Sequence, residues 1–333
     1  MKAVAKEEAT QVSRRPRVVA IGGGTGLSVL LRGLKHRDLD LTAIVTVADD
    51  GGSSGILREE LGMPPPGDIR NVIEALADAE PLLARVLSYR FSNGAGLRGH
   101  SLGNLILAAM RDITGDFVSG VRELSRVLAV RGRVLPAAGQ AIVLKAEMED
   151  GSVVSGESAI PRAGGKIRRV FIEPQDVEPL PEAVEAIREA DAVLAGPGSL
   201  YTSIIPNLLV SRLAEAIRAS RAVKIYICNV MTQPGETDGY ALSDHLEAIE
   251  RHAGGRLFDY AIVHLGSIPP EMERMYAERG ARVVHPDVEE AERRGYRVVT
   301  DYLAQFTTYV RHDAARLSDH ICRLVGEAMT ARE

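Results

Sequence analysis

Short apolar runs that end in glycine-rich or acidic turns recur along the chain, and residues with helical periodicity follow each run. Residues 17–21 and 41–48 are two such runs, and residues 27–34 between them have the apolar spacing of a helix. This alternation is typical of βα units, whose parallel strands are joined by right-handed crossovers. The pattern therefore predicts an α/β fold with a doubly wound, mostly parallel sheet.

The same alternation continues toward the end of the chain. Asp313 precedes a last apolar-periodic stretch, which predicts a helix toward Met329. Together the elements predict one domain over residues 17–329, and the charged and small residues 1–16 predict a disordered tail. Further strands are predicted at residues 192–195, 223–228, 260–264 and 282–285.

Two segments depart from the alternation. Residues 64–130 have mostly helical periodicity and begin with three prolines, after which Asp68 is placed to cap a helix. Residues 141–173 alternate between apolar and polar positions, and Asp150-Gly151 between two runs is typical of a tight hairpin. We therefore expect a mainly helical insertion and a small antiparallel excursion.

Composition and charge narrow the classes of function. The 333 residues include 45% hydrophobic and 26% charged residues, as in folded globular proteins, so a sizeable core is available. The net charge of -5 gives no general attraction to nucleic acid or anionic lipid. Charges interrupt every apolar stretch before the roughly 18 residues that span a bilayer. Two cysteines are too few for a disulfide framework. We expect a cytoplasmic protein that binds neither nucleic acid nor membrane.

A glycine-rich turn follows the first predicted strand directly. Such a turn between strand and helix presents backbone N–H groups and the positive helix end to an anion. It lacks the lysine of a P-loop, and Leu27 stands where a dinucleotide fingerprint has its third glycine. The alternative is a tight turn without a ligand. The candidate ligand-binding residues here are Gly22, Gly23, Gly24, Thr25 and Gly26.

Two adjacent acids, Asp49 and Asp50, end the second predicted strand and precede a turn that contains Ser53. Carboxylates at this edge of a sheet could accept ribose hydroxyl groups, or could hold Mg²⁺ through water. The alternative is that aspartate and glycine are simply good turn formers.

A second glycine turn, with Gly196, Gly198 and Ser199, lies between the strand at 192–195 and a helix. In a parallel sheet both glycine turns lie at the carboxyl edge, so the two could flank one diphosphate. Asn229 and Thr232 follow another strand to the same edge.

Several other polar residues have a ligand-binding and a structural interpretation. His100 and Asn104 are four residues apart on one helix face, and a buried structural network is the alternative to ligand binding. His264, His285 and Asp287 could form a metal site, or the histidines could be hydrogen-bonded turn residues. No nucleophile elbow, HExxH motif or Cys/His metal spacing is present, so binding is better supported than catalysis.

Six motifs follow one another along residues 17–329: VVAIGGGTGLSVLLRGL, VTVADDGGSSG, PPPGDIRN, GHSLGNL, GPGSLYTSIIPNLL and NVMTQPGET. In this order they resemble the CofD/YvcK family, most closely its bacterial YvcK branch. The resemblance implies a Rossmann-like fold. One kind of family member is a Mg²⁺-dependent 2-phospho-L-lactate transferase, and the bacterial kind binds UDP-sugars and supports growth and cell shape on gluconeogenic carbon sources.

The resemblance also implies roles for individual residues. The transferase pattern Asn-Thr-Gly-Asp-Asp falls on residues 46–50, where the two acids are present and the polar residues before them are not, and a later family acid falls on Asp68. This departure puts phospholactyl transfer in doubt. In the bacterial branch, residues matching Tyr276 and Arg311 are linked to UDP-sugar contact. Asn71 lies in the motif of Asp68 and is a further ligand-binding candidate.

The resulting hypothesis is a cytoplasmic regulatory protein that binds a UDP-sugar such as UDP-N-acetylglucosamine, a gluconeogenesis factor with a role in cell shape. Binding would require no cofactor, although Mg²⁺ at Asp49 and Asp50 is left open. A homodimer and a protein partner are also left open. The alternative is a Mg²⁺-dependent transferase of the 2-phospho-L-lactate type. A dinucleotide-dependent oxidoreductase is disfavoured by Leu27.

Overall fold

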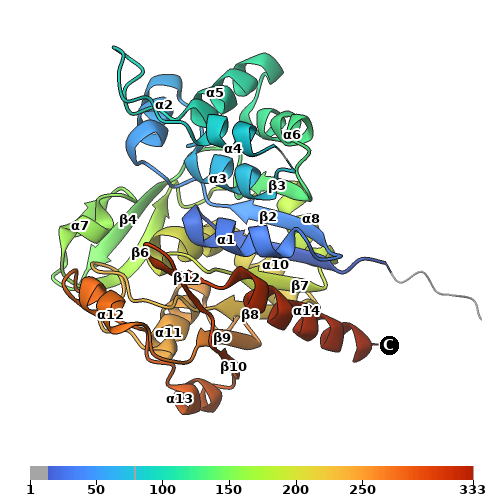
Figure 1. The fold of residues 1–333 in the computed structure, drawn as a ribbon, viewed down its shortest axis with the longest axis vertical. Coiled ribbons are helices and arrows are strands. Elements are labelled where there is room, and N and C mark those ends of the chain that lie inside the picture. The colour runs from blue at the N-terminus through green and yellow to red at the C-terminus, as the bar shows by residue number, and fades with distance from the viewer. Residues whose placement is uncertain (1–13, 79, 333) are drawn as a thin grey trace, which may run out of the picture.

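A seven-stranded sheet, parallel throughout, lies at the centre of the protein (Figure 1). The computed structural model describes residues 14–78 and 80–332. The strands are short apolar segments because both faces of the sheet are covered. In spatial order they are β10 (Arg297–Asp301), β9 (Tyr260–His264), β8 (Val223–Ile227), β7 (Ala192–Ala195), β1 (Arg17–Gly22), β2 (Asp40–Val45) and β3 (Arg133–Pro136).

The order of the strands reverses between β1 and β7. From β1 the chain moves outward to β2 and β3, and it later returns to β7 on the other side of β1. The loops that leave β1 and β7 therefore diverge to opposite faces of the sheet and open a crevice at its carboxyl edge. Such a switch point is where open α/β sheets bind their ligands.

Helices cover both faces of the sheet and bury alternate residues of its strands. Val18 and Ala20 of β1 belong to one apolar core, and Val19 and Ile21 belong to the other. The first core includes residues of α1 (Gly24–Leu34), α3 (Gly67–Leu76) and α14 (Ala314–Thr330), and the second includes residues of α8 (Pro181–Glu189), α9 (Ile205–Leu209), α10 (Leu213–Ala219) and α11 (Leu242–Ala253). In Figure 1, α1 and α14 lie in front of the sheet.

The segment after β2 is helical and gathers at one end of the molecule (Figure 1). Besides α3 it contains α2 (Gly52–Leu61), α4 (Pro81–Ser88), α5 (Leu102–Thr114) and α6 (Phe117–Val127). The prediction that Asp68 caps α3 is wrong. The residue that precedes α3 is Pro66, and Asp68 lies in the first helical turn, from where it reaches Gly23 and Gly24 of α1's N-terminus.

Two small antiparallel sheets and four short helical segments complete the fold. Asp150 and Gly151 form the turn between β4 and β5, as the hairpin prediction requires. The first sheet has the order β5 (Val153–Ser155), β4 (Val143–Met148) and β6 (Ile167–Glu173), and the second pairs β11 (Ala304–Phe306) with β12 (Val310–His312). The remaining segments are α7 (Ile160–Ala163), the π-helical turn η1 (Leu200–Ile204), α12 (Pro270–Ala277) and α13 (Val288–Arg293).

The strand predicted at residues 282–285 is wrong. Within it, Val283 and His285 form only isolated bridges, to Met231 and Ala241, and the edge of the sheet beside β9 is filled by β10. Residue Pro286 follows at once and cannot donate a ladder hydrogen bond, which limits strand formation here.

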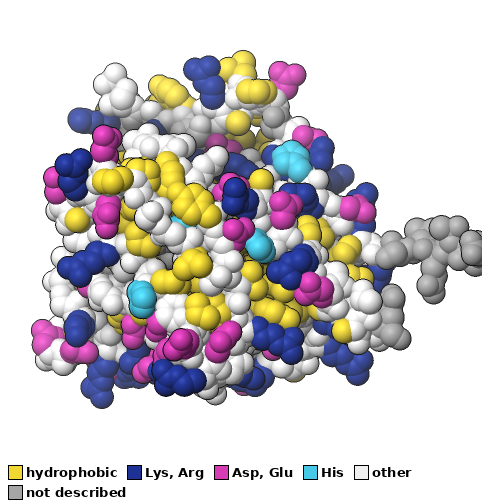
Figure 2. All heavy atoms as spheres, turned by 60° about the horizontal axis from the view of Figure 1, so that its bottom comes forward, with side chains coloured by type: hydrophobic (Ala, Val, Ile, Leu, Met, Phe, Trp, Pro, Cys, Tyr) yellow, Lys and Arg dark blue, Asp and Glu magenta, His cyan; other side chains and the backbone are white. Residues whose placement is uncertain are grey.

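The sequence predicts a disordered tail over residues 1–16 and no segment that spans a membrane. Residues 1–13 lie outside the described residues, whereas Arg14 donates two hydrogen bonds to the Asp191 carboxylate, at 2.6 and 2.8 Å. Within the described ranges, no helix is long and apolar enough to cross a membrane. Figure 2 shows one face of the molecule, on which basic and acidic side chains are intermixed rather than separated.

Candidate functional site

A cleft of about 510 Å³ lies at the switch point, and because both glycine turns line it we call it the main cleft. Both glycine turns and the segments after β8 and β11 contribute to it. This volume falls in the range of roughly 300 to 1,000 Å³ typical of small-molecule sites. The lining residues are 23–26, Val29, 197–199, Ser203, 229–234, Tyr276, Arg279, Ala281 and 310–312.

The two glycine turns touch each other, and glycine is required at the contact. A Cβ added at Gly26 would lie 2.5 Å from the carbonyl oxygen of Pro197, and one at Gly23 would lie 2.5 Å from Oδ2 of Asp68. Gly24 begins α1 with a φ of +63°, which side chains rarely adopt. The backbones of the turns after β1 and β7 are therefore in direct contact at the main cleft.

Asn229 fixes the second turn. Its side-chain oxygen accepts a hydrogen bond from Gly198 N at 3.1 Å, and its Nδ2 donates to Gly198 O at 2.8 Å. Gln233 donates through Nε2 to Ser199 Oγ at 2.7 Å. These bonds hold the turn against the segment after β8, while Thr232 ties that segment to Arg282 through its backbone and its hydroxyl.

Tyr276 and Arg311 both line the main cleft. The Tyr276 hydroxyl accepts a hydrogen bond from Val310 N at 3.0 Å, which joins α12 to β12. Arg311 is exposed, its guanidinium lies 6.0 Å from the centre of the Tyr309 ring, and in the described part of the chain no carboxylate forms an ion pair with it. A free guanidinium at a cleft wall can bind a phosphate oxygen with two parallel hydrogen bonds.

Carboxylates cluster beside the first glycine turn. Burial raises the pKa of Asp68 to about 7, and the charge of Asp49 adds to this rise. Burial also raises the pKa of Glu157 to about 8, with further contributions from Asp49, Asp68 and Asp50. Asp49 accepts from Gly51 N and Asp50 from Ser158 N, so both aspartates also fix backbone turns. No group of three or more histidine, cysteine or acidic residues within the described ranges could hold a metal ion.

The structure divides the predicted binding residues between two clefts. Ten of them line the main cleft: Gly23, Gly24, Thr25, Gly26, Gly198, Ser199, Asn229, Thr232, Tyr276 and Arg311. Four line a separate second cleft of about 270 Å³: Asp49, Ser53, Asn71 and Asn104. The other candidates, Gly22, Asp50, Asp68, His100 and Gly196, line neither.

His100 and Asn104 lie in a buried network of polar side chains, which is the structural alternative to ligand binding. Nδ1 of His100 lies 3.1 Å from Ser53 Oγ, and both side chains are buried. Asn104 is also buried, with its oxygen accepting from Arg70 Nε at 3.1 Å and its nitrogen 3.5 Å from Ser54 Oγ.

Sequence reasoning missed several residues of this region. Glu236 anchors η1 by accepting hydrogen bonds from Tyr201 N and Thr202 Oγ1, and burial raises its pKa to about 7. It lies with Gln233 in the stretch after Asn229, so closer reading of that stretch could have found both. Arg70 and Arg90 line the second cleft, and nothing local in the sequence distinguishes them from surface arginines.

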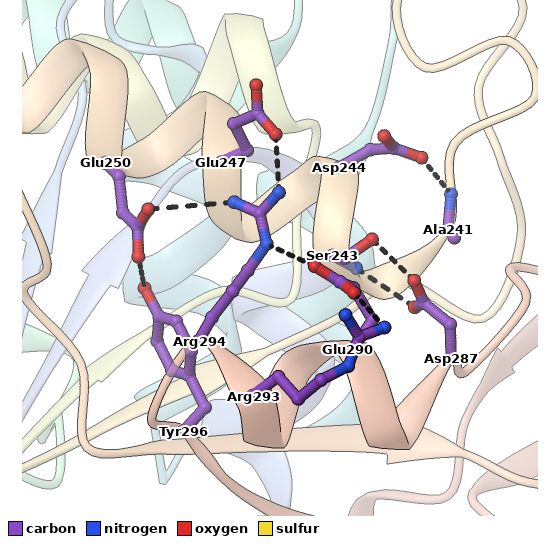
Figure 3. A network of polar contacts seen from close by, with 10 residues as sticks. All are labelled: Ala241, Ser243, Asp244, Glu247, Glu250, Asp287, Glu290, Arg293, Arg294 and Tyr296. Atoms are coloured by element: carbon purple, nitrogen blue, oxygen red, sulfur yellow. Dashed lines mark hydrogen bonds and ion pairs between the residues drawn. The ribbon is translucent and has the colours of Figure 1, made fainter.

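His264, His285 and Asp287 do not form the metal site that their positions in the sequence allowed. Asp287 accepts hydrogen bonds from Ser243 N at 3.0 Å and Ser243 Oγ at 2.5 Å, so it caps α11 (Figure 3). His264 Nδ1 accepts from Leu303 N at 3.0 Å. The network in Figure 3 joins α11 to α13, with Arg294 between the carboxylates of α11 and α13.

The fold and the main cleft define a Rossmann-like α/β protein whose two glycine turns face one cleft at the switch point. The profile of the family described as "2-phospho-L-lactate transferase CofD" matches residues 18–304. The chain belongs to this CofD family.

Relatives and solved structures agree with this assignment. The chain is 54% identical to the gluconeogenesis factor of Bacillus subtilis (strain 168) over 317 residues, which cover 95% of this chain and 100% of that protein. It is 55% identical to the gluconeogenesis factor of Halalkalibacterium halodurans over 309 residues, 92% of this chain and 96% of that protein. A crystal structure of a UPF0052-family protein from Bacillus halodurans has a TM-score of 0.91 and 55% identity, covering 93% of this chain and 100% of that one.

Proposed function

We propose that this protein is a cytoplasmic gluconeogenesis factor that binds a UDP-sugar, such as UDP-N-acetylglucosamine, in the main cleft and acts as a regulator of carbon use and cell shape. The observation that carries the binding proposal is the contact between the two glycine turns, which directs the backbone of both toward one cleft. The gluconeogenic role is supported by the names of the relatives. The role in cell shape rests on the resemblance alone.

The chemistry of the cleft suits a nucleoside diphosphate. Backbone N–H groups at the start of α1 and beside Ser199 suit phosphate oxygens. Arg311 supplies a cation that pairs with no carboxylate in the described ranges, and Tyr276 offers a ring for stacking on the base. Gln233, which also lines the cleft, supplies polar groups for the sugar hydroxyls, and Asn229 holds the second glycine turn in place. Asp49 and Asp50, expected at the ribose from the sequence, do not line this cleft, so we assign them no ribose contact.

Calorimetric titration with UDP-N-acetylglucosamine tests the proposal, with UDP and GDP as comparison ligands. We expect saturable binding, and recovery of the intact ligand by mass spectrometry. Arg311→Ala should weaken binding at least about tenfold, because it removes a charge-assisted contact. Arg188→Ala is the matched control: Arg188 is exposed at the end of α8, which leads to the amino edge of the sheet. Equal affinity of both variants would refute the placement.

A second candidate is a Mg²⁺-dependent transferase of the 2-phospho-L-lactate type. The carboxylates beside Gly23 favour it, as does the family match. Because no group of three or more acids within the described ranges is arranged to hold a metal ion, Mg²⁺ would have to be held by one or two carboxylates together with ligand phosphates. Repeating the titration with Mg²⁺ and analysing the recovered ligand separates the candidates. A cleaved ligand would favour the transferase.

A further inference from the structure

The second cleft is separate from the main one and has polar walls. It lies between the end of β2 and the helices α2, α3 and α5, and every residue that lines it is glycine or carries a polar side chain. A cleft without apolar side chains suits a small, hydrophilic ligand. Its volume of about 270 Å³ is just over half that of the main cleft. The lining residues are Asp49, Gly51, Gly52, Ser53, Ser54, Gly67, Arg70, Asn71, Arg90 and Asn104.

Two arginines from different elements converge on this cleft. Arg70 of α3 donates from Nε to Asn104 Oδ1 and from Nη1 to Glu74, both at 3.1 Å, and its side chain is 12% exposed. Gly103 permits this placement, because a Cβ there would lie 2.6 Å from Arg70 Cδ. Nη2 of Arg70 makes no hydrogen bond within the described ranges.

Arg90 enters from the connection between α4 and α5. Its Nη1 donates to Gly99 O at 2.5 Å and lies 4.0 Å from the position of a Cβ on Gly52. In the part of the chain that the structure describes, no carboxylate pairs with Arg90, and its Nε and Nη2 have no acceptor. Burial lowers the pKa of Arg70; the charge of Glu74 offsets part of this change, and the charge of Arg90 lowers the pKa further. Two positive side chains that line one cleft repel each other less when an anion lies between them.

We infer that the second cleft binds the phosphate monoester of a small polyol. The planar, forked donors of Arg70 and Arg90 match the oxygens of a phosphate group. Asp49 and Asn71 provide acceptors for hydroxyl groups on the rest of the ligand. The buried polar side chains of Ser53, Ser54 and Asn104 form the floor, so the walls are held in place by their own hydrogen bonds.

This site is independent of the ligand of the main cleft and goes beyond the function proposed above. The start of α3 separates the two: Gly67 lines the second cleft, and Asp68 faces Gly23 at the edge of the main cleft. A protein with both sites would respond to a nucleotide sugar and to a phosphorylated polyol at once.

Calorimetric titration of the full chain tests this inference with three probes: glucose 6-phosphate, inorganic phosphate and glucose. We expect glucose 6-phosphate to bind with one-to-one stoichiometry, inorganic phosphate to compete with it more weakly, and glucose not to bind. If inorganic phosphate bound as tightly as glucose 6-phosphate, the inference that the cleft also recognises the polyol part of the ligand would be overturned. Failure of both anions to bind would overturn the site.

Arg90→Ala locates the binding, and because Arg90 is exposed this change leaves the core intact. It should lower the affinity for glucose 6-phosphate at least about tenfold, since one charge-assisted contact is lost. The affinity for UDP-N-acetylglucosamine should not change. Arg98→Ala is the control, an exposed arginine of the same connection that lines neither cleft. Arg311→Ala should show the reverse pattern. If glucose 6-phosphate loses affinity in Arg311→Ala but not in Arg90→Ala, it occupies the main cleft and the inference is wrong.

Discussion

Asn229 and Gly198 exchange two hydrogen bonds, one in each direction, across the gap between β8 and the turn after β7. One amide side chain thereby satisfies both the N–H and the C=O of a glycine at the wall of the main cleft. A turn held in this way keeps its backbone direction before any ligand arrives. Pre-organisation of this kind lowers the entropy cost of binding.

Replacing Asn229 therefore affects both stability and binding. Asn229→Ala leaves the N–H and C=O of Gly198 without their partner and should lower the free energy of unfolding by about 1 to 2 kcal/mol. It should also weaken UDP-N-acetylglucosamine, because the turn is no longer fixed. Urea denaturation measures the first effect and calorimetric titration the second. Unchanged affinity with lowered stability would mean that the turn does not contact the ligand.

The contact between Gly26 and Pro197 makes a second prediction. Gly26→Ala places a methyl group 2.5 Å from the Pro197 carbonyl oxygen and 2.8 Å from its carbon, and backbone on both sides cannot yield easily. We expect a loss of about 1 to 3 kcal/mol in the free energy of unfolding, together with weaker UDP-sugar binding.

Gly326→Ala is the matched control for this substitution. Gly326 lies within α14, and an added Cβ meets nothing within 4 Å. Removing a glycine from a helix interior should raise the free energy of unfolding by about 0.5 to 1 kcal/mol. Chemical denaturation of both variants should therefore give opposite signs. If both variants changed the free energy of unfolding in the same direction, the close approach of Gly26 to Pro197 would not be the reason that glycine is needed at position 26.

The sequence predicted most of the central sheet because its strands are buried on both faces and are therefore short and apolar. The prediction failed where two segments begin with the same three residues. Residues 282–285 read Arg-Val-Val-His and residues 297–300 read Arg-Val-Val-Thr, yet only the second forms a strand, β10. Pairing with β9 decides between them, and this long-range contact has no local signal.

The candidate site shows the same division between local and long-range information. The glycine turns were visible because turn chemistry is local. The division of the candidates between two clefts was not, because it depends on how α3 packs against α5. Arg70 reaches the second cleft only since Gly103 leaves room for its side chain. A lone arginine in a helical sequence is most often a solvated surface residue, so its position needs the structure.

The buried carboxylate of Glu236 makes a prediction about pH. Its pKa is about 7 in the folded protein and 4.5 without burial, so between these values the folded state holds a proton that the unfolded state has lost. The contribution of this group to the free energy of unfolding therefore falls as pH rises from about 4.5 to about 7, by about 3 kcal/mol at most. Below pH 4.5 both states are protonated and the contribution is constant.

Glu236→Gln removes the contribution of this carboxyl group to the pH dependence of stability, because glutamine has the shape of the protonated acid and does not titrate. Urea denaturation of both proteins from pH 5 to pH 8 should show the variant gaining stability relative to the wild type as pH rises. Glu250→Gln on α11 is a useful comparison, since it changes an acid of the Figure 3 network that accepts a hydrogen bond from Tyr296 rather than from η1. A stability difference between Glu236→Gln and wild type that is constant with pH would show that Glu236 is ionised in the folded state.

The cap at the start of α11 makes the last prediction. Asp287 accepts from both the backbone and the hydroxyl of Ser243, which is buried, and its charge lies at the positive end of the helix (Figure 3). Asp287→Ala should lower the free energy of unfolding by about 1 to 2 kcal/mol. Glu289→Ala, at an exposed position of α13, should change it by less than about 0.5 kcal/mol. The loss in Asp287→Ala should be the same with and without EDTA, because the carboxylate acts on α11 rather than on a metal ion; a loss that EDTA abolishes would restore the metal interpretation.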